Sequence, residues 1–268
     1  MRLIVDHRTT YRFTAPQARL IQLLRVNPED THDQSVASWN VHVDCDARFR
    51  RGRDGFGNST TMLYVDGPVD SIEITVSGEV LTNPSNGIVH GAHEPLPPAL
   101  FLRETVLTMA DLDMRDFARD VGLGEPLAAL HALNGAVHRR FALDRGRPAA
   151  GQSAATAFQH PTATPRDLAQ MFIAAARSLG IPARYVSGYS PACFGDDASP
   201  APHGWAEAHV IGLGWVAFDS CTGLCADEAY VRVAVALDSA GAAPVAGSRL
   251  GEGEEALDVD LHVDRAGQ

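Results

Sequence analysis

The hydrophobic pattern of the chain changes its period part-way along the sequence. From Arg2 to Leu81, apolar and polar residues alternate in short runs rich in Val, Ile and Thr, separated by Gly, Pro, Asn and Asp. Alternation of this kind is typical of half-buried strands, and several short strands between such turns favour an antiparallel sandwich. From Asp111 onward, apolar residues fall at helical spacing instead. The sequence therefore predicts an all-β part followed by an α+β part.

The stretch from Asn83 to Pro98, between these parts, is dense in prolines and asparagines. Such residues interrupt helices and strands, so the stretch is typical of a linker. We expect a β-rich N-terminal domain at residues 1–90, a linker at 91–100 and a second domain at 101–268, long enough to bury a core of its own. The end of the second domain is interpreted as a C-terminal extension, in which the alternating run Leu257–Val263 suggests one added strand.

The composition argues against two classes of partner. The formal net charge is −11, from 33 acidic and 22 basic residues. A chain of that charge repels a phosphate backbone, so nucleic acid is not expected as a partner. No stretch approaches the ~20 apolar residues that a membrane-spanning helix requires, so no membrane association is expected either.

The N-terminus and the cysteines bear on the cellular compartment. The first residues lack the apolar run of a signal peptide. The cysteines are few and scattered for a chain of this length, and they do not resemble a disulfide framework. The sequence therefore predicts a cytoplasmic protein. The cysteines are Cys45, Cys193, Cys221 and Cys225.

The best-defined helix begins at Thr164-Pro165-Arg166-Asp167. Thr164 is a suitable N-cap, Pro165 suits the first helical position, and Asp167 stands three residues after the cap, as in a capping box. Gly180 closes the helix and Pro182 prevents its continuation. A strand and then a hairpin are expected after it.

The expected hairpin consists of His203-Gly204-Trp205-Ala206-Glu207 and the run from Trp215 to Asp219, joined around Gly212-Leu213-Gly214. His203 stands at the start of one strand and Asp219 at the end of the next, and such positions can meet across a two-stranded ribbon. A carboxylate that is hydrogen-bonded to a histidine fixes its tautomer and stabilises the imidazolium. The hairpin therefore predicts the supporting half of a nucleophile–base–orienter triad.

These segments closely resemble the core of bacterial transglutaminase-like proteins, and the N-terminal part looks like the β-rich region that precedes that core. The family pattern has a cysteine at a helix entry, then Leu-Gly-Ile-Pro-Ala-Arg, His-x-Trp-x-Glu and Gly-Trp-x-x-Phe-Asp; the last three motifs stand here at 179–184, 203–207 and 214–219. The resemblance implies a papain-like α+β core with a Cys–His–Asp triad. The family's thiolate attacks a glutamine side-chain amide or a related amide, and an amine or water then takes the acyl group from the thioester.

Carried over residue by residue, the resemblance assigns the base to His203 and the orienting carboxylate to Asp219. The nucleophile falls two residues before Asp167, and Pro165 occupies that position. Proline has neither a thiol nor a backbone N–H, yet the first helical position tolerates it. The substitution removes the chemistry and spares the fold. Trp205 and Glu207 are interpreted as cleft residues, with a structural role favoured for Glu207.

Our preferred hypothesis is a pseudoenzyme that binds a peptide or an amide-bearing substrate, or that supports a partner enzyme. The alternative is an active cysteine-type amide hydrolase or acyltransferase that uses Cys193, or water activated by His203 and Asp219. A third hypothesis is a purely structural subunit in which this pair is a relic. Cys221 and Cys225 are interpreted as packing residues.

No metal or other cofactor is expected. The spacing of His203, His209, Cys221 and Cys225 matches no zinc pattern. An extended strand would hold the two histidines roughly 20 Å apart, too far to share one ion. No phosphate loop or dinucleotide fingerprint is visible.

Overall fold

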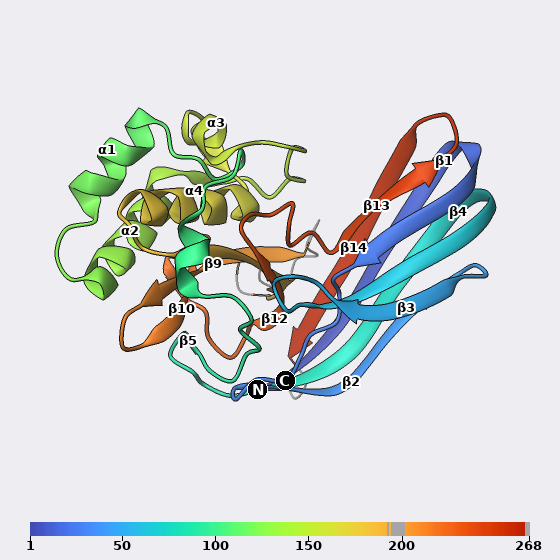
Figure 1. The fold of residues 1–268 in the computed structure, drawn as a ribbon, viewed down its shortest axis with the longest axis horizontal. Helices are drawn as coiled ribbons and strands as arrows, with labels where there is room; N and C mark the ends of the chain where they lie inside the picture. The colour runs from blue at the N-terminus through green and yellow to red at the C-terminus, as the bar shows by residue number, and fades with distance from the viewer. Residues whose placement is uncertain (192, 194–201, 266–268) are drawn as a thin grey trace.

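The computed structural model describes residues 1–191, 193 and 202–265. Two six-stranded sheets dominate this part of the chain. The long strands of the first sheet lie at one end of the molecule, and the second sheet lies at the other end together with the helices (Figure 1). No helix in the described ranges is both long and apolar enough to cross a membrane.

Two long antiparallel strands, β1 (Arg2–Leu24) and β4 (Ser59–Thr82), organise the first sheet. Their register breaks between Arg12 and Arg19, where the ribbon bends. Residues from both sides of the bend share one apolar core, as in a sandwich. On the other edge of β4 lie β2 (Gln34–Val43) and β3 (Arg48–Arg53). The predicted N-terminal antiparallel β domain is confirmed.

The last strands of the chain also belong to this first sheet. β13 (Val245–Leu250) and β14 (Glu255–Arg265) pair with the free edge of β1. The added strand was expected, but its assignment to the second domain was wrong. The physical reason is that β1 would otherwise present an unpaired edge, which folded proteins cover.

The second sheet has the order β11-β10-β9-β8-β12, and β5 (Ile88–Val89) also pairs with β10. Helix α4 packs against β8 and β9, and α1, α2 and α3 each contact α4. A short parallel pair, β6 and β7, lies beside them. The elements of this domain are η1 (Pro98–Leu102), α1 (Leu112–Val121), α2 (Pro126–Arg140), β6 (Ala142–Leu143), α3 (Ala154–Phe158), β7 (Thr162–Ala163), α4 (Pro165–Ser178), β8 (Ala183–Tyr189), β9 (His203–Val210), β10 (Gly214–Asp219), β11 (Leu224–Cys225) and β12 (Val231–Ala236).

Helix α4 begins as the sequence predicts. The hydroxyl of the N-cap Thr164 accepts a hydrogen bond from the Asp167 N–H at 3.3 Å. The carboxylate of Asp167 accepts bonds from the N–H of Thr164 at 3.3 Å and from its hydroxyl at 2.6 Å. Pro165 occupies the first helical position, where its missing N–H removes no helical hydrogen bond. The capping of the helix start therefore does not need a cysteine at position 165.

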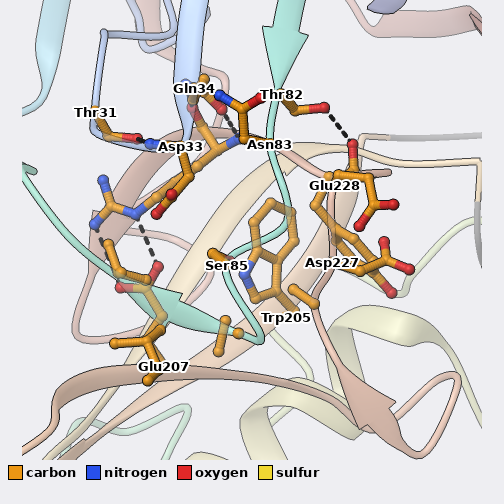
Figure 2. Close-up of a pocket in the computed structure, with 17 residues that line it drawn as sticks. Thr31, Asp33, Gln34, Thr82, Asn83, Ser85, Trp205, Glu207, Asp227 and Glu228 are labelled. Carbon is orange, nitrogen blue, oxygen red and sulfur yellow. Dashed lines mark hydrogen bonds and ion pairs between the residues drawn. The ribbon is translucent and has the colours of Figure 1, made fainter. Parts of the chain in front are cut away.

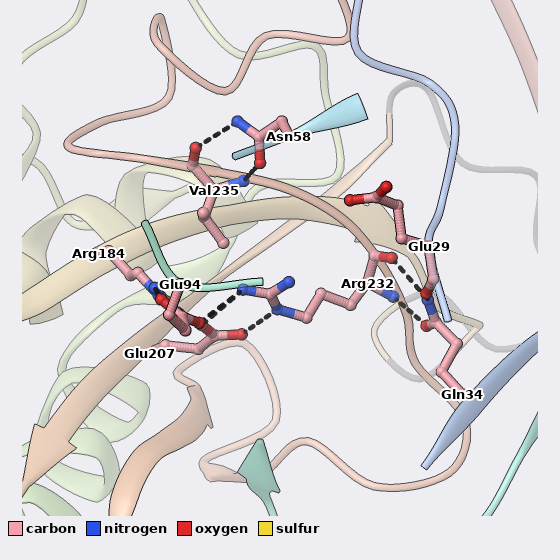
Figure 3. Close-up of polar contacts among 8 residues, drawn as sticks. All are labelled: Glu29, Gln34, Asn58, Glu94, Arg184, Glu207, Arg232 and Val235. Carbon is pink, nitrogen blue, oxygen red and sulfur yellow. Dashed lines mark hydrogen bonds and ion pairs between the residues drawn. The ribbon is translucent and has the colours of Figure 1, made fainter. Parts of the chain in front are cut away.

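Two amide side chains of the N-terminal domain close the outer edge of β12 (Figure 3). Asn58 donates to the carbonyl of Val235 at 2.8 Å and accepts from its N–H at 2.8 Å. Gln34 does the same with Arg232, at 3.0 and 2.8 Å. Each amide satisfies backbone groups that a neighbouring strand would otherwise satisfy. The two domains are thus joined in one defined position.

A buried histidine, His7, lies where β1 meets the second sheet. It is 2% exposed and hydrogen-bonds the Tyr189 hydroxyl at 3.1 Å and the Thr9 hydroxyl at 3.0 Å. Burial lowers the pKa of His7 to about 4, because the surrounding protein disfavours the charged ring.

This burial predicts that the free energy of unfolding falls as the pH is lowered from about 6.5 toward 4. In that window the unfolded chain binds a proton at position 7 and the folded chain does not, so protonation favours the unfolded state. The loss is on the order of 3 kcal/mol. Urea unfolding at pH 7, 6, 5 and 4 measures it. His7→Gln should flatten the dependence, whereas the exposed control His42→Gln should retain it. Equal slopes in the wild type and His7→Gln would contradict the assignment.

Candidate functional site

The hairpin of β9 and β10 brings His203 and Asp219 together. Their strands pair antiparallel from Gly214 opposite Val210 to Phe218 opposite Ala206. The Nε2 atom of His203 lies 2.8 Å from Oδ2 of Asp219, and each side chain is 1% exposed. The contact that the sequence predicted between these two residues is therefore present.

Asp219 is held by three hydrogen-bond donors. Besides His203, the Tyr230 hydroxyl donates to Oδ2 at 2.6 Å, and the Cys221 N–H donates to Oδ1 at 2.9 Å. Burial alone would raise the pKa of Asp219, but His203 and these hydrogen bonds lower it below its ordinary value. The carboxylate is therefore charged at neutral pH and accepts hydrogen bonds only. It follows that the Nε2 of His203 carries the proton.

The other ring nitrogen of His203 is free. Among the described residues, Nδ1 has no hydrogen-bond partner although it is buried. In the neutral ring with the proton on Nε2, Nδ1 is an acceptor with an unused lone pair. A base in a nucleophile–base–orienter triad uses such a nitrogen to take the proton of its nucleophile. In this protein, Nδ1 of His203 is available to accept a hydrogen bond from a bound ligand.

Pro165 lies buried at the start of α4, the helix that packs on the strand carrying His203. Tyr185 connects the two regions. Its hydroxyl lies so close to Gly204 that a Cβ atom there would overlap it. Burial raises the pKa of Tyr185, and the charges of Arg166 and Asp219 also act on it. Tyr185 therefore lies beside the strand that carries His203, and Pro165 offers no ionisable group at the helix start.

A disulfide bond joins Cys193 to Cys221, with their Cα atoms 6.0 Å apart. The expectation that the scattered cysteines form no disulfide was wrong for this pair. The two cysteines are 28 positions apart in the sequence, and only the folded chain brings them together. In this bonded state Cys193 offers no thiolate, so it cannot serve as the alternative nucleophile. Residues 192 and 194–201 around it lie outside the described part of the chain.

Trp205 packs against the His–Asp pair. Its ring is stacked on that of His203 with centroids 5.9 Å apart, and it meets the ring of Tyr230 edge-on at 5.3 Å. Trp205 is 2% exposed. The ring therefore holds the imidazole from one side, and Tyr230 holds the carboxylate of Asp219.

Glu207 is the centre of a buried ion network (Figure 3). It accepts hydrogen bonds from Nε of Arg184 at 2.7 Å and from Nε of Arg232 at 2.8 Å. Burial acts to raise the pKa of Glu207, but the two arginines lower it to about 2. Arg184 also binds Glu94 at 2.6 Å and lies 3.8 Å from the ring centroid of Trp215. This geometry makes Glu207 a structural residue that ties the linker to the sheet.

Four residues of the site were not among those that the sequence singled out for a role. Arg184 ends a family-like motif, so its position could have been flagged. Tyr230 and Arg232 lie in a stretch that also resembles the family. No role was predicted for them or for Glu94 from the sequence, because their roles depend on contacts with distant strands. No group of three or more His, Cys, Asp or Glu residues that could hold a metal occurs within the described ranges.

Comparisons with known proteins agree with this geometry. Residues 3–81 match the profile of the bacterial transglutaminase-like N-terminal region, and residues 115–220 match that of the transglutaminase-like superfamily. An uncharacterized protein of Mycobacterium leprae is 26% identical over 286 residues, covering 98% of this chain and 99% of that protein. The crystal structure of a candidate cysteine protease from Cytophaga hutchinsonii has a TM-score of 0.80 and 19% identity, covering 100% of this chain and 91% of that one. The structural likeness supports the predicted fold class, with a papain-like second domain.

The ion network predicts a large effect of Glu207→Gln on stability. The substitution leaves Arg184 and Arg232 with Glu94 as their one remaining shared carboxylate. One buried positive charge is then uncompensated, which costs about 3–5 kcal/mol. Urea unfolding followed by tryptophan fluorescence measures the loss. The matched control is Glu79→Gln, which removes an exposed ion pair with Arg2 and should change stability far less. Similar losses in both variants would contradict the structural role of Glu207.

Proposed function

From the premise that this chain belongs to the transglutaminase-like superfamily, we propose that it is a pseudoenzyme whose former thiol site binds an amide group of a peptide or protein. The observation that carries the proposal is the combination of Pro165 at the helix start with a free Nδ1 on His203. The contacts that orient the histidine are present. The residue at the position of the family's nucleophile has no nucleophilic group.

The proline accounts for the loss of acyl transfer. Without a thiol, no covalent bond to a substrate carbonyl can form at this position. Without the N–H of residue 165, one donor that could stabilise an oxyanion is also missing, and such a donor contributes about 10²–10³ in rate. The disulfide removes Cys193 from the set of available nucleophiles.

An amide group complements the free nitrogen of His203. Nδ1 of His203 needs an N–H donor, which a carboxamide supplies. Nε of Arg166, one residue after Pro165, also lacks a partner, and the C=O of a carboxamide is an acceptor of the kind it needs. Because buried polar groups are normally hydrogen-bonded, both unsatisfied nitrogens favour a ligand of this kind.

Replacing Pro165 with cysteine tests the position of the missing nucleophile. If residue 165 faces His203, as the proposal requires, a thiol there should have a lowered pKa. It should then react with iodoacetamide at least about tenfold faster than the free thiols of Cys45 and Cys225. Burial raises the pKa of both of these reference thiols. Mass spectrometry at pH 7 gives the rates. The double variant Pro165→Cys/His203→Ala should lose the enhancement.

An introduced thiol that reacts no faster than Cys45 would show that residue 165 does not face the imidazole. The unmodified protein should release no ammonia from glutamine peptides. Ammonia release that disappears in Cys193→Ala would contradict the pseudoenzyme proposal and favour a working amide hydrolase.

Binding of a small amide tests the proposed function directly. N-acetylglutamine amide should bind the wild type, and N-acetylglutamate amide, which lacks the side-chain N–H, should bind more weakly. Calorimetry should show affinity reduced about fivefold in His203→Ala, the effect of one lost hydrogen bond in a buried site. The exposed His262→Ala is the control. Equal binding by the wild type and His203→Ala would mark the His–Asp pair as a relic.

A further inference from the structure

A cavity of about 70 Å³ lies where the N-terminal domain meets the second sheet, with Trp205 in its wall (Figure 2). Its wall includes Asp33 before β2, Thr82 at the end of β4, and Trp205 and Tyr230. One water needs about 10–15 Å³ of such space, so the cavity admits roughly five water-sized groups. That size suits the head group of a small molecule.

Two aromatic rings form a corner of this cavity. Trp205 and Tyr230 both line it, and their rings meet at 77° with centroids 5.3 Å apart. The faces of such rings attract cations. The indole N–H of Trp205 also enters no hydrogen bond between described residues, although the residue is 2% exposed. A buried indole normally has an acceptor, so an occupant of the cavity would supply one.

The charges around the cavity are unbalanced. Asp33, Asp227 and Glu228 line it, and none of their carboxylates forms an ion pair with another described residue. Asp227 accepts one hydrogen bond, from the N–H of Ala229 at 2.8 Å. The positive group of the wall, Arg232, is already bound to Glu207. A positively charged occupant would therefore meet three uncompensated carboxylates.

We propose that this cavity binds a small amino alcohol through its ammonium group. The ammonium would lie against the rings of Trp205 and Tyr230 and the carboxylates. The hydroxyl oxygen would accept a hydrogen bond from the indole N–H of Trp205. The proposal concerns a different place from the amide site and does not depend on it. The two sites are neighbours. Trp205 of the cavity wall also stacks on His203, and the Tyr230 hydroxyl also donates to Asp219.

Calorimetric titration with 2-aminoethanol tests the proposal on the full chain. Binding should be saturable, and N-acetylethanolamine, which keeps the hydroxyl and loses the charge, should bind at least about tenfold more weakly. Tighter binding of 2-aminoethanol than of its acetylated form supports the proposal.

Isosteric variants locate the site. Asp33→Asn and Glu228→Gln should each weaken 2-aminoethanol binding about fivefold, because each removes one charge from the wall. Asp70→Asn removes the same charge at an exposed position on β4 outside the cavity lining and should change affinity less than about twofold. Equal binding of 2-aminoethanol and N-acetylethanolamine would overturn the proposal. Equal losses in all three variants would also overturn it, since they would reflect net charge alone.

Discussion

The buried carboxylate of Glu207 holds together the face of the second sheet on which the candidate site is built. It stands on β9 and binds arginines from β8 and β12, and both arginines also pair with Glu94 in the linker. The two buried positive charges are therefore balanced by two carboxylates. The network ties β9 to β8 and β12. His203 and Trp205 take their positions from that strand, so the geometry of both proposed sites depends on this ion network.

The His–Asp pair is held in position by contacts that do not involve residue 165. Asp219 accepts hydrogen bonds from three donors, its pKa is lowered, and Nδ1 of His203 has no partner among the described residues. Pro165 supplies no thiol and does not disturb the helix, because the first helical position needs no N–H. Buried polar atoms are normally hydrogen-bonded, so Nδ1 of His203 is a natural contact for an occupant or a water.

The two domains contribute jointly to the molecule. The C-terminal strands complete the first sheet, while Gln34 and Asn58 of the N-terminal domain close the edge of β12. Without the other part of the chain, each sheet would therefore have an edge strand with unpaired backbone groups. The cavity beside Trp205 exists only at this junction, since its wall combines residues of both domains. Trp205 and Tyr230, which line it, also contact His203 and Asp219.

The sequence by itself determined the features that depend on neighbouring residues. The capping of α4 by Thr164 and Asp167, the hairpin that brings His203 to Asp219, and the β character of the first eighty residues all follow from local pattern. Tertiary structure alone decided the Cys193–Cys221 bond, the role of Tyr230 and the sheet to which the last strands belong. These contacts join residues far apart in the chain, and local periodicity carries no information on which distant edges and faces will meet.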